Sequence, residues 1–566
     1  MNIFSILNSL MDRRDKQFLV ILLFLTFVIS LVELLGVSAI LPFIAIVSDF
    51  SLIYKNKYIH FFYSFLHFNS PVQFIIILGI LLICYYFLRG VLNFLYYYIL
   101  SRFSYGRYKK IADKLLNNYL FLPYIRFIEI DSPTIFRTIL GESQSLSQLI
   151  SSMILLISEL FTIILLYILL LLVNWESTLI LTITFSLIFL FFIKTISKQI
   201  KKESTRRAVN QKTAHKVVTN TINNFKWIRL IASEKLFFKH FTEAMNDIAK
   251  SNIIYNSLVH FPRLFLEFIG FAIIIFIVIF FISRSEENIS NIIPYISVYV
   301  VALYRILPSY NRILSSYNAI MFNIKSVYII GGELSREPEA LGDEKIVFHK
   351  EIKLKNIYFN YENNKCILKN IEMVVVQGSR VSIEGASGTG KSTLLDLIMG
   401  LQKPDEGEVL IDGVKLEDKN IKNWRMKIGY IPQDIFLFDG TLAENIVFGR
   451  KYVKNNIISA LEKANMEHIL MRKKGINTKI GEGGINLSGG EKQRLAIARA
   501  IYGNPEIIIM DEATSALDLS IETKIMSELY NICHDKTLII VSHRQNTVKN
   551  CDKCFEIKNG HIYELI

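Results

Sequence analysis

The chain has 566 residues, more than one ordinary domain holds, so two or more folding units are expected. Apolar residues make up 52% of the chain and charged residues only 20%, whereas an average soluble domain is about 25% charged. This composition excludes a disordered chain, a collagen-like fibre and a disulfide-stapled secreted domain. It predicts that a large part of the protein lies in lipid.

The formal net charge is +13, which is common in nucleic-acid-binding proteins, so the placement of the basic residues decides its meaning. The five cysteines are few and scattered, and Cys551 and Cys554 form a lone CxxC without a second pair or a histidine cluster. We expect incidental or structural cysteines in a reducing, cytoplasmic setting rather than a metal or redox site.

Six apolar runs approach or exceed the roughly 18–20 residues that are needed to cross a bilayer. They are Phe18–Val47, Val72–Leu100, Leu146–Val173, Leu179–Ile196, Leu264–Ile282 and Ile292–Tyr317. The first run is too long for a cleavable signal peptide and lacks a small-residue cleavage site. We therefore expect six transmembrane helices.

Basic residues gather on one side of these spans, before the first span and in the long segments after the second and the fourth. They are Arg13, Arg14, Lys16, Arg102, Arg107, Lys109, Lys110, Lys114, Arg126, Arg137, Lys198, Lys201, Lys202, Arg206, Arg207, Lys212, Lys216, Lys226 and Arg229. The opposite connections carry only Lys55, Lys57 and Arg284. This positive-inside asymmetry predicts a cytoplasmic N-terminus and explains the basic excess by topology, so no nucleic-acid partner is expected.

Both long cytoplasmic segments are expected to be helical. Asp131–Thr134 has the pattern of an N-cap with Pro at the first turn. Asn224–Ile228 places two aromatic residues on either side of a lysine, within a basic segment. These segments are either solvated turns or docking helices that meet a soluble domain.

On the outer side, the segment 52–68 carries aromatic residues at helical spacing, at positions 54, 58, 61, 62 and 65. It is either a helix on the outer membrane surface or an aromatic belt that anchors two spans.

A phosphate-binding loop follows the charged stretch after the last span. Strand Arg380–Glu384 leads into a GxxxxGK[ST] loop and then into the apolar helix Thr393–Leu401, the context that this motif requires. Backbone N–H groups would cradle the phosphates, Lys391 would neutralise them and Ser392 would ligate Mg²⁺. The nucleotide-binding residues expected here are Gly385, Ala386, Ser387, Gly388, Thr389, Gly390, Lys391, Ser392 and Thr393.

Downstream, Ile507–Glu512 is predicted to be a buried strand that ends in two carboxylates. Asp511 suits the Mg²⁺ shell, and Glu512 suits a general base that polarises the attacking water. The alternative is a pair of solubilising acids at a strand end, which is hard to reconcile with the phosphate loop upstream.

The segment Leu487-Ser488-Gly489-Gly490-Glu491 resembles the signature of ATP-binding-cassette (ABC) proteins, with Glu491 in place of the usual Gln. Other motifs follow in family order: Tyr361 matches the aromatic that stacks on adenine, Gln433 the Q-loop, Ser515–Asp518 the D-loop and His543 the switch histidine. The resemblance implies catalytic roles for Glu512, His543 and Gln433, a Mg²⁺ shell of Ser392, Gln433 and Asp511, and nucleotide contacts from Tyr361, Ser488, Gly489, Gly490 and Glu491.

The resemblance implies an α-helical, six-span transmembrane domain at residues 1–325, a linker at 326–350 and an α/β P-loop cassette at 351–566. In this family the signature loop caps the ATP that a different cassette holds. One cassette per chain therefore implies a homodimer with ATP and Mg²⁺. The expected location is the bacterial inner membrane, with the cassette in the cytoplasm.

The whole chain resembles bacterial flippases of lipid-linked oligosaccharides, the PglK type, through Ile29–Asp49, Phe87–Arg107 and Leu303–Tyr317 as well as the cassette. This resemblance implies translocation of a polyprenyl-diphosphate-linked oligosaccharide, for protein glycosylation or for lipopolysaccharide assembly. The alternatives are an exporter of other amphipathic lipids or drugs, and a chain that uses ATP-driven clamping for signalling.

Arginines within or at the edge of the spans are the candidate substrate residues: Arg89, Arg263, Arg305 and Arg312. Arg305 and Arg312 are seven residues apart and share a helix face, so they need water or an anion between them. Guanidinium groups suit a diphosphate, which they bind bidentately. The alternatives are snorkelling to the interface and, for Arg263, an ion pair with Glu267. No role is assigned to the intramembrane Glu33 and Glu159.

Overall fold

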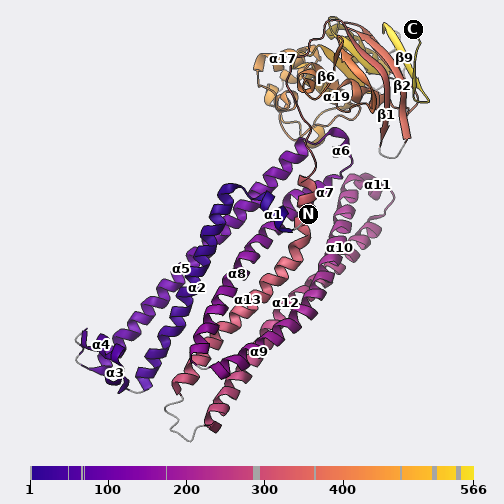
Figure 1. Ribbon diagram of the computed structural model, residues 1–566. Helices are drawn as coiled ribbons and strands as arrows, with labels where there is room; N and C mark the ends of the chain where they lie inside the picture. Colours follow the sequence, from indigo (N-terminus) through magenta and orange to yellow (C-terminus); the bar gives the residue numbers. More distant parts are fainter. Residues whose placement is uncertain are drawn as a thin grey trace. The chain divides into compact units, whose positions relative to one another are not determined.

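The computed structural model describes residues 3–48, 50–65, 68, 70–173, 175–284, 293–361, 365–471, 474–512, 519–542 and 550–565. The chain forms two compact units (Figure 1). The helical unit comprises Met1–Leu120 and Ile130–Glu337, and the sheet unit comprises Phe121–Glu129 and Pro338–Ile566.

The helical unit is built from long helices with short helices at their turns. The long helices are α2 (Arg13–Ser48), α5 (Pro71–Leu120), α8 (Ser143–Val173), α9 (Trp175–Phe192), α10 (Lys198–Asn223), α12 (Glu234–Arg284) and α13 (Ile293–Leu334). The short ones are α1 (Ile3–Leu10), α3 (Leu52–Lys55), α4 (Lys57–Phe65), α7 (Ser132–Phe136) and α11 (Phe225–Leu230), with π-helical turns at Arg137–Glu142 and Ile193–Ser197.

Among the described residues, three helical stretches are long and apolar enough to cross a membrane: Arg13–Val47, Pro71–Leu120 and Ser132–Leu172. Apolar side chains such as Phe87 and Phe94 are exposed on α5, as expected of a surface that faces lipid. The other predicted spans fall mainly in α9, α12 and α13, where part of the side chains lie outside the described residues. Six spans therefore stays a prediction.

Helices α2, α5, α8 and α13 pack together, and hydroxyl side chains lie at their contacts. Ser30 Oγ of α2 is 3.0 Å from Thr162 Oγ1 of α8, and Ser104 Oγ of α5 is 2.9 Å from Ser147 Oγ of α8. Small hydroxyl residues allow helices to approach closely where the surrounding lipid provides no hydrophobic drive for association. This contact layer sets the positions of the charged residues described below.

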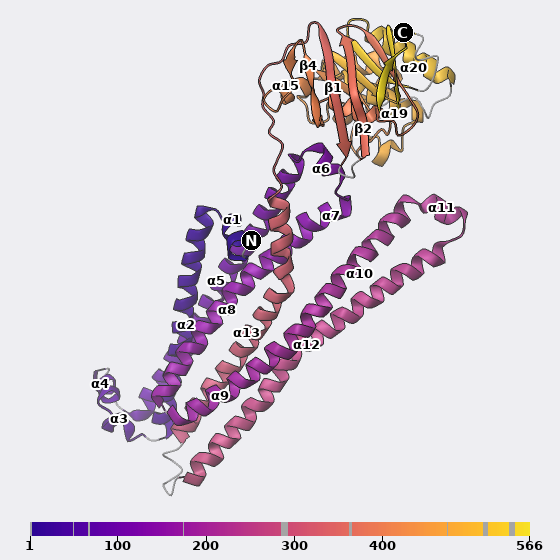
Figure 2. The same ribbon diagram turned by 45° about the vertical axis from the view of Figure 1, so that its right-hand side comes forward.

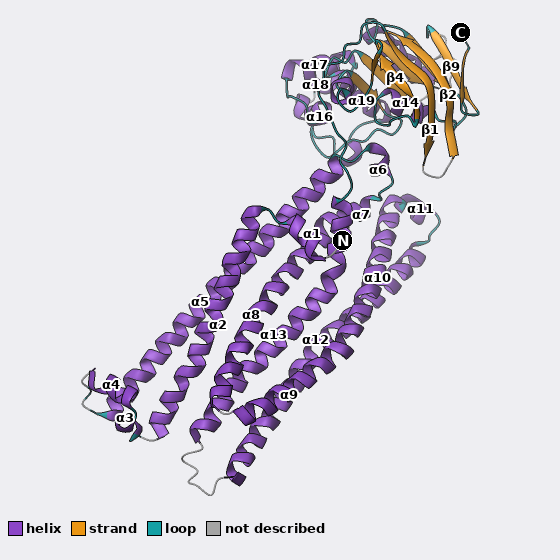
Figure 3. Cartoon of the chain, viewed as in Figure 1, coloured by secondary structure: helices purple, strands orange, loops and turns teal. Residues whose placement is uncertain are grey.

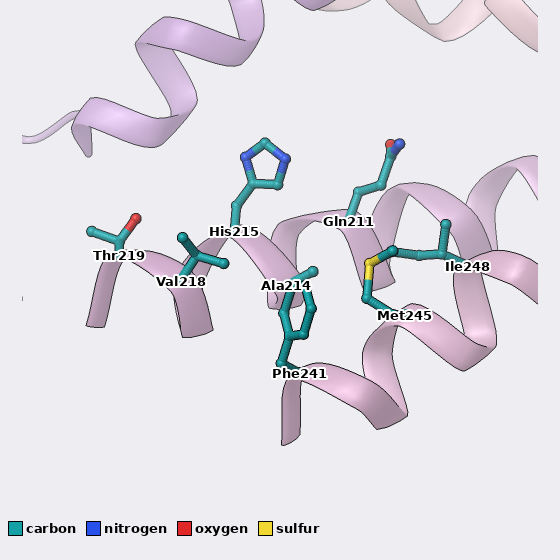
Figure 4. A pocket seen from close by; sticks show the side chains of 8 residues that line it. All are labelled: Gln211, Ala214, His215, Val218, Thr219, Phe241, Met245 and Ile248. Atoms are coloured by element: carbon teal, nitrogen blue, oxygen red, sulfur yellow. The ribbon is translucent and has the colours of Figure 1, made fainter. Parts of the chain in front are cut away.

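Helices α10 and α12 form a long hairpin that turns at α11 (Figure 2). Ala214, Ala244 and Ile248 make its buried contact. Beside this contact, Gln211, His215 and Met245 border a hollow of about 400 Å³ (Figure 4). The predicted helix in this second long loop is present as α11, whereas its docking on a soluble domain stays a prediction.

The short helices confirm two local predictions and correct one detail. The aromatic segment on the predicted outer side is helical as α3 and α4, and Tyr58 and Phe65 are exposed on it. Helix α7 begins at Ser132, directly after Asp131, with Pro133 in its first turn. The Asp131 side chain makes no capping hydrogen bond, so the predicted N-cap has the position but not the bond.

The sheet unit contains two sheets, drawn in orange in Figure 3. The antiparallel sheet has the order β2-β1-β4-β5, with β1 (Glu351–Tyr361), β2 (Lys365–Val376), β4 (Glu406–Ile411) and β5 (Val414–Lys415). The second sheet has the order β10-β9-β3-β8-β7-β6, with β3 (Arg380–Glu384), β6 (Ile428–Ile431), β7 (Ile507–Asp511), β8 (Thr537–Val541), β9 (Lys553–Lys558) and β10 (His561–Glu564).

Strands β9, β3, β8, β7 and β6 run parallel to one another in this second sheet, and the edge strand β10 pairs with β9 in the antiparallel direction. Residues Ile507–Asp511 and Thr537–Val541 are buried along their whole length, because a parallel sheet is covered on both faces. The unit's helices are α6 (Tyr124–Ile128), α14 (Lys391–Ile398), α15 (Ile421–Arg425), α16 (Leu442–Val447), α17 (Lys454–Lys463), α18 (Glu467–Leu470), α19 (Gly489–Ile501) and α20 (Leu519–Ile532), with 3₁₀ turns at Gly475–Asn477 and Glu482–Gly484.

The segment Phe121–Glu129, which comes from the first long loop, belongs to the sheet unit. Glu339 N–H donates to Phe121 C=O at 2.6 Å, and Ile125 packs against the apolar core of β1, β2 and β3. The segment named in the sequence analysis, Asp131–Thr134, leads into α7 of the helical unit, so its docking on the soluble domain stays a prediction.

Candidate functional site

The phosphate loop lies between β3 and α14, at the centre of the second sheet. Gly385 has φ +145° and Gly390 has φ +104°. A Cβ on Gly385 would lie 2.6 Å from the Ile557 carbonyl oxygen, and one on Gly390 would lie 2.7 Å from Ile367 Cγ2. Glycine is therefore required at both positions. The tight turn aims backbone N–H groups and the α14 N-terminus at one point, which suits an anion.

The Lys391 ammonium lies inside this loop. Its Nζ donates to the Gly385 and Ala386 carbonyls at 2.7 and 3.3 Å, and it lies 3.3 Å from Glu512 Oε1. The side chain is only 6% exposed. A phosphate that entered the loop would replace neutral carbonyls and one carboxylate with a stronger anionic partner for this buried cation.

Asp511 ends β7 at the same edge of the sheet where β3 ends, because β3, β8 and β7 run parallel. Burial raises the pKa of its carboxyl, and a hydrogen bond from Ser392 opposes the rise. The Asp511 and Ser392 oxygens are thus adjacent, as a shared hard cation requires. A Mg²⁺ ion held by Asp511, Ser392 and Gln433 would supply charge neutralisation for nucleotide phosphates.

Glu512 follows Asp511 and has φ +44°, a left-handed conformation that is uncommon for this residue type. Its Oε2 accepts from Gln433 Nε2 at 3.3 Å, and its Oε1 faces Lys391. The conformation turns Glu512 out of the buried strand and into the space between the phosphate loop and the residues after β6. The predicted general base and the predicted orienting amide are thereby brought together.

Tyr361 ends β1 beside the helix of the phosphate loop. Its hydroxyl is 3.4 Å from Thr393 Oγ1, and Gln402 Nε2 donates to it at 3.3 Å. Gln402 Nε2 also donates to Asp396 Oδ2 at 3.1 Å. The predicted adenine-stacking residue is therefore connected to α14 through Gln402 and Asp396.

Sequence reasoning missed Gln402 and Asp396, because neither belongs to a recognisable motif. Burial and the nearby Asp511 carboxylate raise the pKa of Asp396 to about 6, while the hydrogen bond from Gln402 opposes the rise. The only available signal for Asp396 was an acidic residue among the apolar residues of the second half of α14.

The signature segment forms the N-terminus of α19. Ser488 is the N-cap: its Oγ accepts from Glu491 N–H at 3.3 Å, and Glu491 Oε2 accepts from Ser488 N–H at 2.8 Å. Glu491 Oε1 is also 3.2 Å from His468 Nε2. The capping box uses Glu or Gln equally well, which explains how Glu491 fits where Gln is usual.

Several predicted site residues lie outside the described part of the chain. They are His543 and the D-loop segment Ser515–Asp518. The backbone of Arg263 lies in α12 and that of Arg305 in α13, whereas both side chains are outside the described residues.

The other two arginines in the helical unit have carboxylate partners on neighbouring helices. Arg89 Nη2 of α5 is 3.6 Å from Glu33 Oε1 of α2, and its guanidinium lies over the Tyr86 ring. Gly36 of α2 lies beside this group: a Cβ there would lie 3.3 Å from Tyr85 Cε1, which is tight, and 3.6 Å from Arg89 Nη1, which is an ordinary contact.

Arg312 of α13 makes a two-point contact with Glu159 of α8. Its Nε donates to Oε1, and its Nη2 donates to Oε2 at 3.1 Å and to Ser309 Oγ at 3.4 Å. The sequence analysis expected water or an anion beside Arg312 and assigned no role to either glutamate. The Glu159 carboxylate is such an anion. What the sequence analysis missed is the role of the glutamates, because Glu33 and Glu159 each pair with an arginine on a different helix.

Comparison with protein families yields two matches. A model described as ABC transporter transmembrane region covers residues 17–305, and one described as ABC transporter covers residues 368–515. A solved structure titled "Structure of a bacterial Atm1-family ABC exporter with ATP bound" has a TM-score of 0.79 and covers 98% of this chain and 94% of that chain. At 20% identity this likeness shows the fold.

Individual relatives are similar over most of the chain. The "ATP-dependent lipid A-core flippase" of Pseudomonas fluorescens (strain Pf0-1) is 30% identical over 487 residues, which are 84% of this chain and 80% of that protein. The protein of the same name from Aromatoleum aromaticum (strain DSM 19018 / LMG 30748 / EbN1) is 29% identical over 488 residues, which are also 84% of this chain and 80% of that protein. The rat "ATP-binding cassette sub-family B member 6" is 34% identical over 288 residues, which are 50% of this chain and 34% of that protein.

Proposed function

Because the chain belongs to the ABC transporter family and is an ATP-hydrolysing half-transporter of the exporter type, we propose that it is a lipid flippase. Its proposed cargo is a polyprenyl-diphosphate-linked oligosaccharide, which moves from the cytoplasmic to the outer leaflet of the bacterial inner membrane. The oligosaccharide then serves protein glycosylation or lipopolysaccharide assembly.

The observation that carries this proposal is the presence of partly exposed guanidinium groups within apolar helices. Arg312 is 34% exposed and Arg89 is 19% exposed, although both belong to the helical unit and stand among apolar residues. Guanidinium binds diphosphate bidentately, and an isolated charge in bare hydrocarbon nominally costs tens of kcal/mol. A cationic path therefore suits an anionic headgroup whose lipid tail stays in the bilayer.

The relatives named as lipid A-core flippases support a lipid cargo but a different headgroup. The alternative is accordingly an exporter of other amphipathic lipids or drugs. A drug exporter has no need of intramembrane arginines, whereas a transporter of any phosphate-bearing lipid needs a cation beside the phosphate.

For the ATPase, we assign Glu512 as the general base for the attacking water, with Gln433 orienting it and His543 contacting the γ-phosphate. Lys391 and the loop 385–390 hold the phosphates, and Tyr361 stacks on adenine. Ser488, Gly489, Gly490 and Glu491 act on the ATP of the second copy in a homodimer.

Reconstitution in proteoliposomes tests the proposed cargo. Labelled polyprenyl-diphosphate oligosaccharide should move between leaflets only with ATP and Mg²⁺, and Glu512→Gln should abolish the movement. Transport of apolar dyes with no response to the labelled lipid would contradict the proposal.

A further inference from the structure

The two intramembrane ion pairs share an asymmetry in burial. The Glu33 and Glu159 side chains are each 7% exposed, whereas their partners Arg89 and Arg312 are 19% and 34% exposed. In both pairs the carboxylate is the covered member, and the guanidinium is the member that an approaching solute meets.

A third ion pair in the same unit lacks this asymmetry. Arg107 of α5 pairs with Asp15 of α2, and the two side chains are 8% and 7% exposed. Asp15 Oδ1 also lies 3.0 Å from Lys110 Nζ. Lys110 is 44% exposed, whereas both members of the Arg107–Asp15 pair are covered. This pair therefore serves as a comparison in which the arginine is closed to an approaching solute.

We propose that Glu33 and Glu159 are resident counter-ions that hold Arg89 and Arg312 when no cargo is bound and that yield them to the anionic headgroup of the cargo. The inference rests on the proposed function, because it takes the arginines to contact that headgroup. An arginine without a partner in an apolar helix is costly, and each carboxylate removes this cost in the cargo-free state.

The geometry of Arg312 suits such an exchange. Glu159 accepts from its Nε and Nη2, and within the described residues no acceptor faces its Nη1. An incoming phosphate oxygen can therefore bind Nη1 first and then compete for Nη2, while the buried carboxylate stays within reach. When the headgroup leaves, the carboxylate recovers the guanidinium, and this return favours release.

The two pairs also belong to one polar layer of the bundle. Ser30 and Thr162, whose hydroxyl oxygens are 3.0 Å apart, lie one helical turn from Glu33 and Glu159 respectively. One pair joins α2 to α5 and the other joins α8 to α13. Exchange of a carboxylate for cargo therefore changes the contact between two helices in each case, which links cargo binding to helix packing.

The test measures lipid-stimulated ATP hydrolysis in nanodiscs of phosphatidylcholine, with wild type and Glu159→Gln. The probes are a polyprenyl diphosphate, phosphatidylglycerol and neutral polyprenol. Glutamine keeps the shape and one acceptor but removes the competing charge. We expect the half-saturating concentration of the anionic probe to fall about tenfold, kcat to fall because release slows, and the polyprenol response to stay the same.

Two matched variants separate a counter-ion from a structural bond. Asp15→Asn removes an equally buried carboxylate from the covered pair and should lower Tm without changing the half-saturating concentration. The reversal Glu159→Arg with Arg312→Glu restores an ion pair but presents a carboxylate to the cargo, so the protein should fold and lose its response to anions. An unchanged half-saturating concentration in Glu159→Gln, or a wild-type response in the reversal, overturns the proposal.

The probe panel distinguishes this inference from the proposed cargo. If the diphosphate does not stimulate wild type but Glu159→Gln tightens the response to phosphatidylglycerol, the cargo assignment fails and the counter-ion role stands. If the diphosphate stimulates wild type and Glu159→Gln does not tighten it, the counter-ion role fails alone. If no anionic lipid stimulates wild type, both proposals are wrong.

Discussion

The sheet unit and the helical unit manage buried charge in different ways. In the sheet unit, Lys391 lies against two carbonyls of its own loop, six residues or fewer away, and against Glu512 of the second predicted motif, while the capping box joins Ser488 to a residue three positions on. In the helical unit, Arg89 and Arg312 have partners on other helices, 56 and 153 positions away. Local partners leave a sequence motif, whereas distant ones do not. The following predictions test whether chemistry also divides in this way, with ATP turnover in one unit and cargo recognition in the other.

The largest effect is expected in the sheet unit from Glu512→Gln. The amide keeps the shape of the side chain but cannot accept a proton from the attacking water, so kcat for ATP hydrolysis should fall by about two to four orders of magnitude. ATP binding, measured by equilibrium dialysis, should persist. Near-normal steady-state hydrolysis would remove Glu512 from the role of general base.

In the helical unit, Arg305→Ala should lower flipping about tenfold to a hundredfold, because the proposed contact of Arg305 with the cargo headgroup is a charge-assisted hydrogen bond, worth about 1.5–3 kcal/mol. Arg305→Lys should recover only part of the rate, since ammonium keeps the charge but not the bidentate geometry. Flipping, ATP turnover and Tm are measured on the same samples. If Lys is fully competent and Ala mainly lowers Tm, the arginine anchors the helix at the interface instead.

A smaller effect separates the two members of the signature capping box. Ser488→Ala removes the N-cap of α19 and should destabilise the protein by about 1 kcal/mol. Glu491→Gln keeps an acceptor for the Ser488 N–H and should change stability by less than about 0.5 kcal/mol. Denaturant unfolding of both variants tests this order. Equal losses would show that the carboxylate charge of Glu491, which lies beside His468, contributes as much as the Ser488 cap.

The smallest effect concerns Asp396, whose pKa is raised to about 6 by burial and by the Asp511 carboxylate. A raised carboxyl pKa means that the folded state favours the protonated form. The stability from this group is therefore present below the unfolded pKa, near 4, and lost as the pH rises through about 6. Asp396→Asn should thus raise Tm by about 2–4 °C at pH 7.5 and by almost nothing at pH 4.5. An equal change at both pH values would contradict the ionisation argument.

Much of the sheet unit could be predicted from the sequence. The phosphate loop, the buried strand Ile507–Asp511 and the start of α19 each depend on residues within a few positions, and hydrophobic pattern or glycine placement records them. Gln402 could not be predicted as a partner of Tyr361, because the two residues meet only after the two sheets have formed. In the helical unit, the apolar runs predicted helices, and the helix periodicity predicted which residues share a face. It did not predict which neighbouring helix each face meets.

By itself the sequence determined the order of a helical part and a P-loop part, the residues that close on a phosphate, and the presence of arginines among apolar residues. These features follow from composition, short spacing and backbone preference, which are local properties of the chain. Only the tertiary structure decided that Glu33 pairs with Arg89 and Glu159 with Arg312, and that the guanidinium is the more exposed member of each pair. The reason is physical: the burial of a charge depends on the packing of several helices at once, and no single segment of sequence carries that information.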